Sequence, residues 1–286
     1  MLAAIMGIAC GPASDRRLVG HDVESKALGR DLPFSILMPP ACPDGVEDNR
    51  NLHVVYLLHG YGGNSRSLDE EGISDELFIA QAEGRIPHVY IVAPDGERGF
   101  YMNWHDGSLR YEDYMTQEVF PAAEAALGLE IDRSRRHLVG VSMGGHGALL
   151  LGLKHPEMFE SVASISGSLF DRAKAAELAG KRFLDWTIDI TRMLGDGSDE
   201  EFLEANNPYS LVERLPAAER PRIFLAYGTE EPESLRLATT RFHDFLVEEG
   251  IGHEWAPFDG SHNWESWAPV IEEAISHATG HGPETR

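Results

Sequence analysis

Short apolar runs rich in β-branched residues recur along the chain between turn residues, and they predict six strands. All except the first are apolar with almost no alternation, which is typical of strands buried on both faces of a parallel sheet. The predicted strands are FSILMP (34–39), LHVVYLLH (52–59), HVYIVAP (88–94), RHLVGVS (136–142), SVASISG (161–167) and RIFLAYG (222–228).

Segments with apolar residues at helical spacing lie between these strands. Strands and helices in alternation indicate right-handed crossovers and a doubly wound α/β sheet. The segment 169–208 also has helical character but contains no predicted strand, so we expect it to cap the sheet. The predicted helices cover 111–127, 143–154, 231–250 and 263–278.

The 286 residues contain no Pro/Ser-rich linker and no repeat, so we expect a single domain with a large core over residues 25–278. Residues 279–286 are polar and contain Gly and Pro, which predicts a frayed tail.

Residues 1–24 are expected to precede the domain. They open with MLAAIMGIAC, a short apolar run that ends at a cysteine as a bacterial lipoprotein leader does, although no Lys or Arg precedes it. A leader with Cys10 as the lipid-bearing residue and an unstructured start are both open, which leaves the localisation between the cytoplasm and export. Cys10 and Cys42 could form at most one disulfide and cannot make a metal site by themselves.

The formal net charge of −23 would repel phosphate backbones and acidic membrane surfaces, which argues against nucleic acid and anionic polymers as partners. No apolar run approaches the roughly 20 residues that a transmembrane helix needs. We therefore expect no membrane span.

Residues 140–144 read Gly-Val-Ser-Met-Gly, a G-x-S-x-G pattern, where a predicted strand ends and a predicted helix begins. A nucleophile elbow requires this context, because small residues at 140 and 144 let the chain turn tightly and expose the Ser142 hydroxyl beside a helix N-terminus. The alternative is a glycine-rich turn with an incidental serine.

A serine hydroxyl needs a base that is held in place by a third group, and in elbow hydrolases the chain order is Ser, acid, His. His262 lies in the loop DGSHNW between HEWAPF, a further candidate strand, and the last helix, where it can reach over the sheet edge. We expect it to be the base. The other histidines after Ser142 lie within or beside helices or in HEWAPF: His146, His155, His243, His253 and His277.

The acid is expected after the strand 222–228, where the chain offers only glutamates. Glu231 is favoured by its distance from Gly228, Glu230 is second, and Glu233 is also present. A glutamate can orient the histidine ring, but its longer side chain requires the loop to sit further back. Carboxylates on a surface turn are the alternative for Glu231 and Glu230.

The segment LLHGYGGN (57–64) ends a buried strand and opens a glycine-rich loop near the elbow. The backbone N–H groups of Tyr61 and Met143 are predicted to form an oxyanion hole, where one donor typically contributes about 10²- to 10³-fold in rate. A simple glycine-rich turn is the alternative.

Several segments in order, from about Ser25 to about Trp267, together resemble the esterase family of α/β-hydrolases. This family includes tributyrin esterases, S-formylglutathione hydrolases and the acetylxylan and feruloyl esterases of carbohydrate esterase family 1, and mycolyltransferases are relatives. The segments are SKALGRDLPFSILMPP, VVYLLHGYGGN, YIVAPDG, NWHDG, YEDYMTQEVFPAAEA, HLVGVSMGGHGALLLGLKHPEMFESVASISG and GSHNWESW.

The resemblance implies an α/β-hydrolase fold with a helical cap. It places the nucleophile on Ser142, the base on His262 and the oxyanion donors on Tyr61 and Met143. The family's acid, usually the aspartate of a G-T-x-D turn, falls on Glu231, which is a departure. The family often has an aromatic residue near NWHDG in its pocket, which implies Trp104. Trp264 and Trp267 are expected to pack the last helix.

These residues predict a serine carboxylic ester hydrolase that forms an acyl-enzyme from short-chain acyl, acetyl or feruloyl esters. The substrate is a small-molecule or polysaccharide-linked ester, and the oligomeric state is open. No cofactor or metal is expected, because the thirteen histidines show no H-E-x-x-H spacing. The alternatives are an acyltransferase of the mycolyltransferase type and a catalytically dead hydrolase fold that binds carbohydrate or protein.

Overall fold

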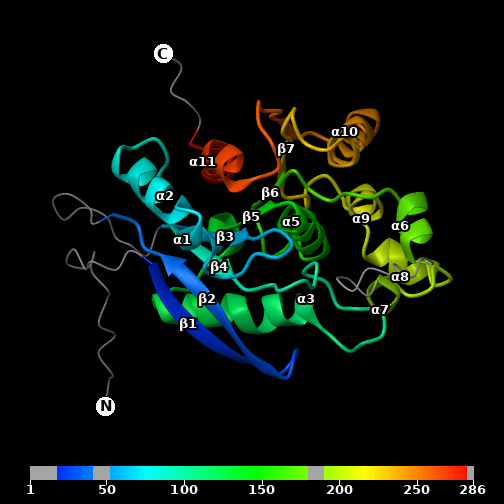
Figure 1. Ribbon diagram of the computed structural model, residues 1–286, viewed down its shortest axis with the longest axis horizontal. Coiled ribbons are helices and arrows are strands. Elements are labelled where there is room, and N and C mark those ends of the chain that lie inside the picture. The colour runs from blue at the N-terminus through cyan, green and yellow to red at the C-terminus, as the bar shows by residue number, and fades with distance from the viewer. Residues whose placement is uncertain (1–17, 41–51, 180–189, 282–286) are drawn as a thin grey trace.

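The computed structural model describes residues 18–40, 52–179 and 190–281. Their strands form one eight-stranded sheet in the order β1-β2-β4-β3-β5-β6-β7-β8 (Figure 1). Pairing is parallel from β4 to β8, and β1 and β2 add an antiparallel edge. The strands are β1 (Leu18–Ser25), β2 (Arg30–Leu37), β3 (His53–Leu58), β4 (Val89–Pro94), β5 (Arg136–Val141), β6 (Ser161–Ile165), β7 (Arg222–Ala226) and β8 (Glu254–Trp255).

Helices cover both faces of this sheet, as a doubly wound fold requires. On one face lie α1 (Ser67–Glu70), α2 (Ile73–Ala82) and α11 (Trp264–Thr279). The opposite face is covered by the continuous helical run of α3 (Tyr111–Asp113), the π-helical η2 (Tyr114–Val119) and α4 (Phe120–Leu127), and by α5 (Met143–Lys154), α9 (Pro208–Arg214) and α10 (Glu233–Glu248). A short 3₁₀ turn, η3 (Arg133–Arg135), leads into β5.

The segment 169–208 is helical in its described part, as predicted, and holds no strand there. It supplies α6 (Arg172–Ala179), α7 (Ile190–Leu194) and α8 (Glu200–Ala205), which lie together with α9 at one end of the molecule (Figure 1). Residues 180–189 of this segment, like Cys10 and Cys42, lie outside the described residues.

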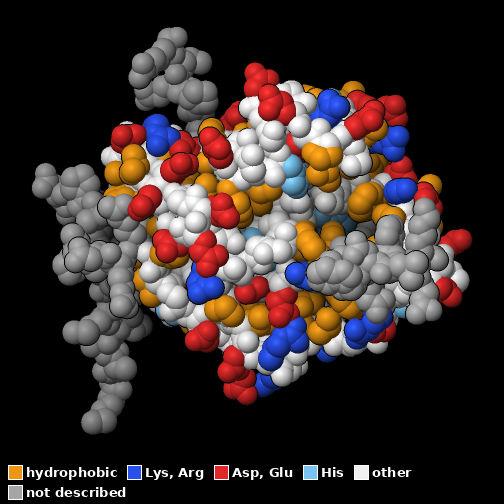
Figure 2. Space-filling model, viewed as in Figure 1, with side chains coloured by type: hydrophobic (Ala, Val, Ile, Leu, Met, Phe, Trp, Pro, Cys, Tyr) orange, Lys and Arg blue, Asp and Glu red, His pale blue; other side chains and the backbone are white. Residues whose placement is uncertain are grey.

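The surface reflects the acidic composition. Acidic side chains are spread over the outer part of the face in Figure 2, and histidine side chains lie nearer its centre among hydrophobic and uncharged atoms. Among the helices that the structure describes, none is long and apolar enough to cross a membrane.

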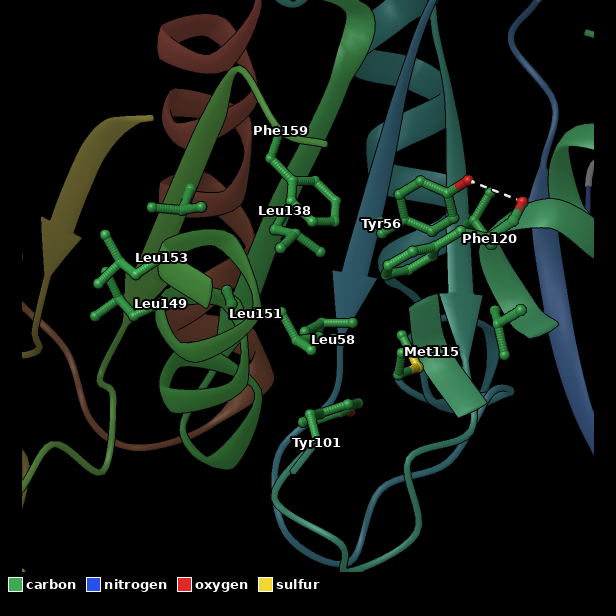
Figure 3. Packing of buried hydrophobic residues seen from close by; sticks show 14 of the residues in the cluster. Tyr56, Leu58, Tyr101, Met115, Phe120, Leu138, Leu149, Leu151, Leu153 and Phe159 are labelled. Atoms are coloured by element: carbon green, nitrogen blue, oxygen red, sulfur yellow. Dashed lines mark hydrogen bonds between the residues drawn. The ribbon is translucent and has the colours of Figure 1, made fainter. Parts of the chain in front are cut away.

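Large apolar side chains fill the layer between the sheet and α5 with the 111–127 helical run (Figure 3). Leu58 and Leu138 project from β3 and β5 toward Leu151 of α5, and all three are fully buried. Fully burying one such side chain stabilises a fold by roughly 1.5 to 3 kcal/mol. This layer therefore holds α5, and with it the elbow, firmly on the sheet.

The register of the central strands brings the predicted site segments together. Leu58 at the end of β3 pairs with Gly140 near the end of β5, and Gly140 pairs in turn with Ser164 of β6. The loops after these parallel strands therefore leave the sheet at the same edge, where open α/β sheets bind their ligands.

Candidate active site

Ser142 occupies a strained turn between β5 and α5. Its backbone has φ 55° and ψ −117°, a left-handed conformation that non-glycine residues rarely adopt. A Cβ on Gly140 would lie 2.0 Å from the carbonyl oxygen of Gly144, and one on Gly144 would lie 2.1 Å from that of Leu58. Only glycine fits at either position, so the two glycines have the roles that the elbow pattern predicts.

His262 reaches Ser142 from the loop between β8 and α11. Its Nε2 lies 2.9 Å from Ser142 Oγ. The next residue, Asn263, caps α11 by accepting a hydrogen bond of 2.9 Å from the backbone N–H of Ser266, which fixes the loop at the start of the helix. Among the described histidines, His262 is the one whose ring contacts the Ser142 hydroxyl.

The other ring nitrogen of His262 faces Glu231. His262 Nδ1 and Glu231 Oε1 are 3.4 Å apart, and the carboxylate side chain is fully buried. This separation is longer than an ordinary N–H···O hydrogen bond, and catalytic hydrogen bonds often tighten only when substrate binds. Glu230, the second candidate from sequence, is exposed, and its carboxylate accepts a hydrogen bond of 3.3 Å from the Ser261 hydroxyl.

Ser166, which the sequence did not single out for this site, holds one oxygen of the Glu231 carboxylate, and Trp267 in turn holds Ser166. The Ser166 hydroxyl donates to Glu231 Oε1, and the indole N–H of Trp267 donates to Ser166 Oγ at 3.0 Å. Trp267 also packs its ring edge-on against His262, with centroids 4.8 Å apart. The sequence signal that could have indicated Ser166 is its position at the end of β6, the strand beside β5. In the structure Ser166, like Ser142, has a positive φ of 55°.

The predicted oxyanion loop lies directly against the elbow. A Cβ on Gly60 would be 3.2 Å from Ser142 Cβ, so the backbone of this loop passes within contact distance of the serine. Met143 is the first residue of α5, where backbone N–H groups have no partner within the helix. Both candidate donors, Tyr61 and Met143, therefore belong to segments that flank Ser142.

His59 fixes the direction of the Tyr61 N–H. Its buried ring donates from Nδ1 to the carbonyl of Gly60 at 2.8 Å and accepts at Nε2 from the N–H of Gly96 at 2.9 Å. The Gly60 carbonyl and the Tyr61 N–H belong to one planar trans peptide and point in opposite directions. By holding the carbonyl, His59 aligns the N–H on its other side.

A cavity of about 160 Å³ opens beside the elbow. Burial lowers the pKa of His146, one turn after Ser142, to about 4, so this ring is neutral near pH 7. The predicted pocket residue Trp104 is not among the described residues that line this cavity, and its indole N–H donates to Gly99 O at 3.3 Å. The lining comes from Phe100, Met102, His146, Ser168, Phe170, Leu178, Ile190, Met193, Leu194, Asn206 and Asn207.

Residues 25–277 match the Esterase family, whose description reads "Putative esterase". The chain belongs to this esterase family. An acetyl esterase of Caldicellulosiruptor saccharolyticus is 26% identical over 88% of this chain and 94% of that protein. A more distant relative, the diacylglycerol acyltransferase/mycolyltransferase Ag85A of Mycobacterium leprae, is 26% identical over 96% of this chain and 88% of that protein.

Solved structures share the fold of the esterase. A ferulic acid esterase superposes with a TM-score of 0.73 at 21% identity, covering 92% of this chain and 98% of the other. The fluorophosphonate-binding serine hydrolase FphF of Staphylococcus aureus superposes with a TM-score of 0.74 at 17% identity, with the same coverage. The α/β-hydrolase fold and the family together make the protein a carboxylesterase-type serine hydrolase.

Proposed function

We propose that the esterase cleaves carboxylic esters through an acyl-enzyme on Ser142, with His262 as the base and Glu231 as the group that orients it. The observation that carries the proposal is the 2.9 Å contact from Ser142 Oγ to His262 Nε2, with the buried Glu231 carboxylate on the opposite ring nitrogen. A nucleophile, a base and an orienting acid in this order are the arrangement by which a catalytic triad is recognised, which supports the proposal.

In the first step Ser142 Oγ attacks the ester carbonyl while its proton passes to His262 Nε2. The resulting imidazolium is stabilised by the Glu231 carboxylate, and the negative carbonyl oxygen accepts hydrogen bonds from the Tyr61 and Met143 N–H groups. His262 then gives its proton to the leaving alcohol oxygen, and the C–O bond to the alcohol breaks. The products are a free alcohol and an ester between the acyl group and Ser142.

In the second step water takes the place of the alcohol. His262 removes a proton from the water, the hydroxyl attacks the acyl-enzyme carbonyl, and the proton returns to Ser142 Oγ as the carboxylic acid leaves. The chemistry requires an ester with an accessible carbonyl, whether its alcohol is a small molecule or part of a polysaccharide. The acetyl esterase among the relatives and the ferulic acid esterase among the structures support an ester substrate, and their names specify the acid and not the alcohol.

Acyl transfer is the second candidate, favoured by the mycolyltransferase relative. It shares the acyl-enzyme and differs only in whether water or another alcohol resolves it. Product analysis with an added alcohol acceptor separates the two reactions, since a hydrolase yields only the free acid. The only support for a catalytically dead fold is that a glutamate stands where the resemblance expects an aspartate. The buried position of Glu231 beside His262 argues against this alternative.

The test is the initial rate on p-nitrophenyl butyrate for the wild type and Ser142→Ala. We expect the variant to lose roughly 10⁴-fold or more in kcat, because removing the nucleophile of a triad disables the whole unit. Its far-UV circular dichroism should match that of the wild type. A folded variant with unchanged activity would defeat the proposal.

A further inference from the structure

Two residues that line the cavity contact the main chain of the elbow. The backbone N–H groups of His146 and Ser168 both donate to the Ser142 carbonyl, at 3.2 and 3.4 Å. The cavity therefore borders the backbone of the elbow that carries Ser142.

The cavity lies on the side of the oxyanion loop. The Phe100 ring, which lines it, packs against the Tyr61 ring with centroids 6.4 Å apart and against the His146 ring at 6.0 Å. None of its described lining residues belongs to the loop that carries His262. The leaving alcohol must lie at His262, because this ring protonates it. The acyl part of the ester then points the other way, toward the cavity.

The size of the cavity sets the size of the group that it can hold. Its volume of about 160 Å³ is close to that of the roughly 150 Å³ apolar cavity that accepts benzene in an engineered protein. An acetyl group would leave most of this space empty, which forfeits dispersion contacts along the walls. A straight or cyclic group of about six carbons would fill it.

Among the described lining residues, the polar side chains carry no free charge. The Asn206 side chain accepts from Lys154 Nζ at 3.1 Å and donates to Phe202 O at 2.9 Å. The Asn207 side chain donates to Phe170 O and accepts from the Tyr209 N–H, both at 3.0 Å. With His146 neutral and no Lys or Arg among the described lining residues, a carboxylate in the cavity would be buried without a counter-charge, which is costly.

We propose that this cavity is the acyl pocket and that it selects esters of uncharged, apolar acids of about six carbons over acetyl esters and over acids that carry a second carboxylate. The inference rests on the proposed function, since it assigns the acyl side of the same reaction.

The experiment compares kcat/KM on p-nitrophenyl acetate, hexanoate and the mono-ester of adipic acid. We expect the hexanoate to exceed the acetate by at least about tenfold, because one methylene in an apolar pocket is worth roughly that much. The adipate mono-ester, which has a six-carbon chain ending in a carboxylate, should fall below the hexanoate by a similar factor.

Two variants move the chain-length preference in opposite directions. Leu194→Trp fills the cavity and should lower the ratio of hexanoate to acetate at least fivefold, whereas Met193→Ala enlarges it and should raise the ratio of octanoate to hexanoate. Leu237→Trp is the matched control, because Leu237 is 42% exposed on α10, outside the cavity lining, and its ratios should equal those of the wild type. If the larger Leu194 side chain prevents folding, Met193→Ala still tests the pocket.

The outcomes separate the two claims. A wild type that hydrolyses acetate as well as hexanoate, or folded pocket variants with ratios within twofold of the wild type, would overturn the pocket assignment and leave the proposed function standing. The assignment also fails if the variants change the preference among acetate esters of different alcohols but not among acids. A wild type inactive on every ester would instead overturn the proposed function.

Discussion

Glu231 has one methylene more than the aspartate that the sequence resemblance led us to expect in this turn, and its carboxylate still lies 3.4 Å from His262 Nδ1. A Cβ on Gly228 would lie 2.3 Å from the Gly260 carbonyl oxygen, so the two loops pack backbone against backbone beside the glutamate. The Ser166 hydroxyl then holds one carboxylate oxygen. The residue type could be predicted from the sequence, but its contact with Ser166 depends on the neighbouring strand β6.

The first prediction concerns this acid. Glu231→Gln removes the negative charge that stabilises the His262 imidazolium, and we expect kcat to fall by roughly 10³- to 10⁴-fold with little change in KM. Glu230→Gln is the matched control, because Glu230 is exposed and does not contact His262, and it should stay within about twofold of the wild type. Equal losses in both variants, measured by initial rates, would refute the assignment.

At the scale of elements, the buried strands and the elbow helix were the most predictable features. All six predicted strands are present. Five of them are continuous apolar runs, which are typical of strands buried on both faces of a parallel sheet. The helix predicted over 143–154 is α5, with the same bounds. This helix could be predicted because its signals are local: the glycines of the elbow mark where it begins, and the apolar run follows directly after them in the sequence.

The elements that sequence reasoning missed are those whose stability comes from distant partners. β1 alternates between half-buried and exposed residues and is held by its antiparallel pairing with β2. α1 and α2 are short. The buried residues of α2 belong to the same hydrophobic cluster as those of α11. Neither pattern is strong enough by itself to indicate an element, because the contacts that stabilise it come from residues far along the chain.

The elbow yields a prediction about stability. Gly144→Ala places a Cβ 2.1 Å from the Leu58 carbonyl oxygen, and backbone cannot move aside cheaply, so we expect a loss of about 2 to 3 kcal/mol or more. Gly252→Ala is the control, since a Cβ there would have no atom within 4 Å. Denaturant unfolding of both variants measures the difference, and equal stabilities would show that α5 can shift away from β3.

At the scale of the whole molecule, the two ends of the parallel strands carry different groups of polar residues. The carboxyl ends carry the candidate triad, whereas the amino ends of β3, β5 and β6 hold a chain of polar contacts from the half-buried His53 to the buried His137 and Ser161. There His53 Nδ1 lies 2.8 Å from His137 Nε2, and His137 Nδ1 lies 2.9 Å from Ser161 Oγ. Burial lowers the pKa of His137 to about 3, and the nearby charges of His53 and Arg222 make smaller contributions in the same direction.

This histidine predicts a pH dependence of stability. Below its ordinary pKa of 6.5, His137 takes up a proton in the unfolded chain but stays neutral in the folded one until about pH 3. Its contribution to the free energy of unfolding therefore falls by about 1.4 kcal/mol per pH unit as the pH drops below 6.5. Urea unfolding at pH 7, 6 and 5 should show a shallower decline for His137→Gln. If the free energy of unfolding declined equally with falling pH in the wild type and in His137→Gln, His137 would not be the origin of the pH dependence.

The central claim is that Ser142 is the nucleophile, and covalent labelling tests it most directly. Diethyl p-nitrophenyl phosphate transfers its phosphoryl group to an activated serine hydroxyl with release of p-nitrophenolate, and peptide mass spectrometry then locates the label. We predict one label per chain, on the peptide that contains Ser142, with esterase activity lost in proportion to labelling and no label in His262→Ala. Stoichiometric label on another residue, or full inactivation with Ser142 unmodified, would contradict the account.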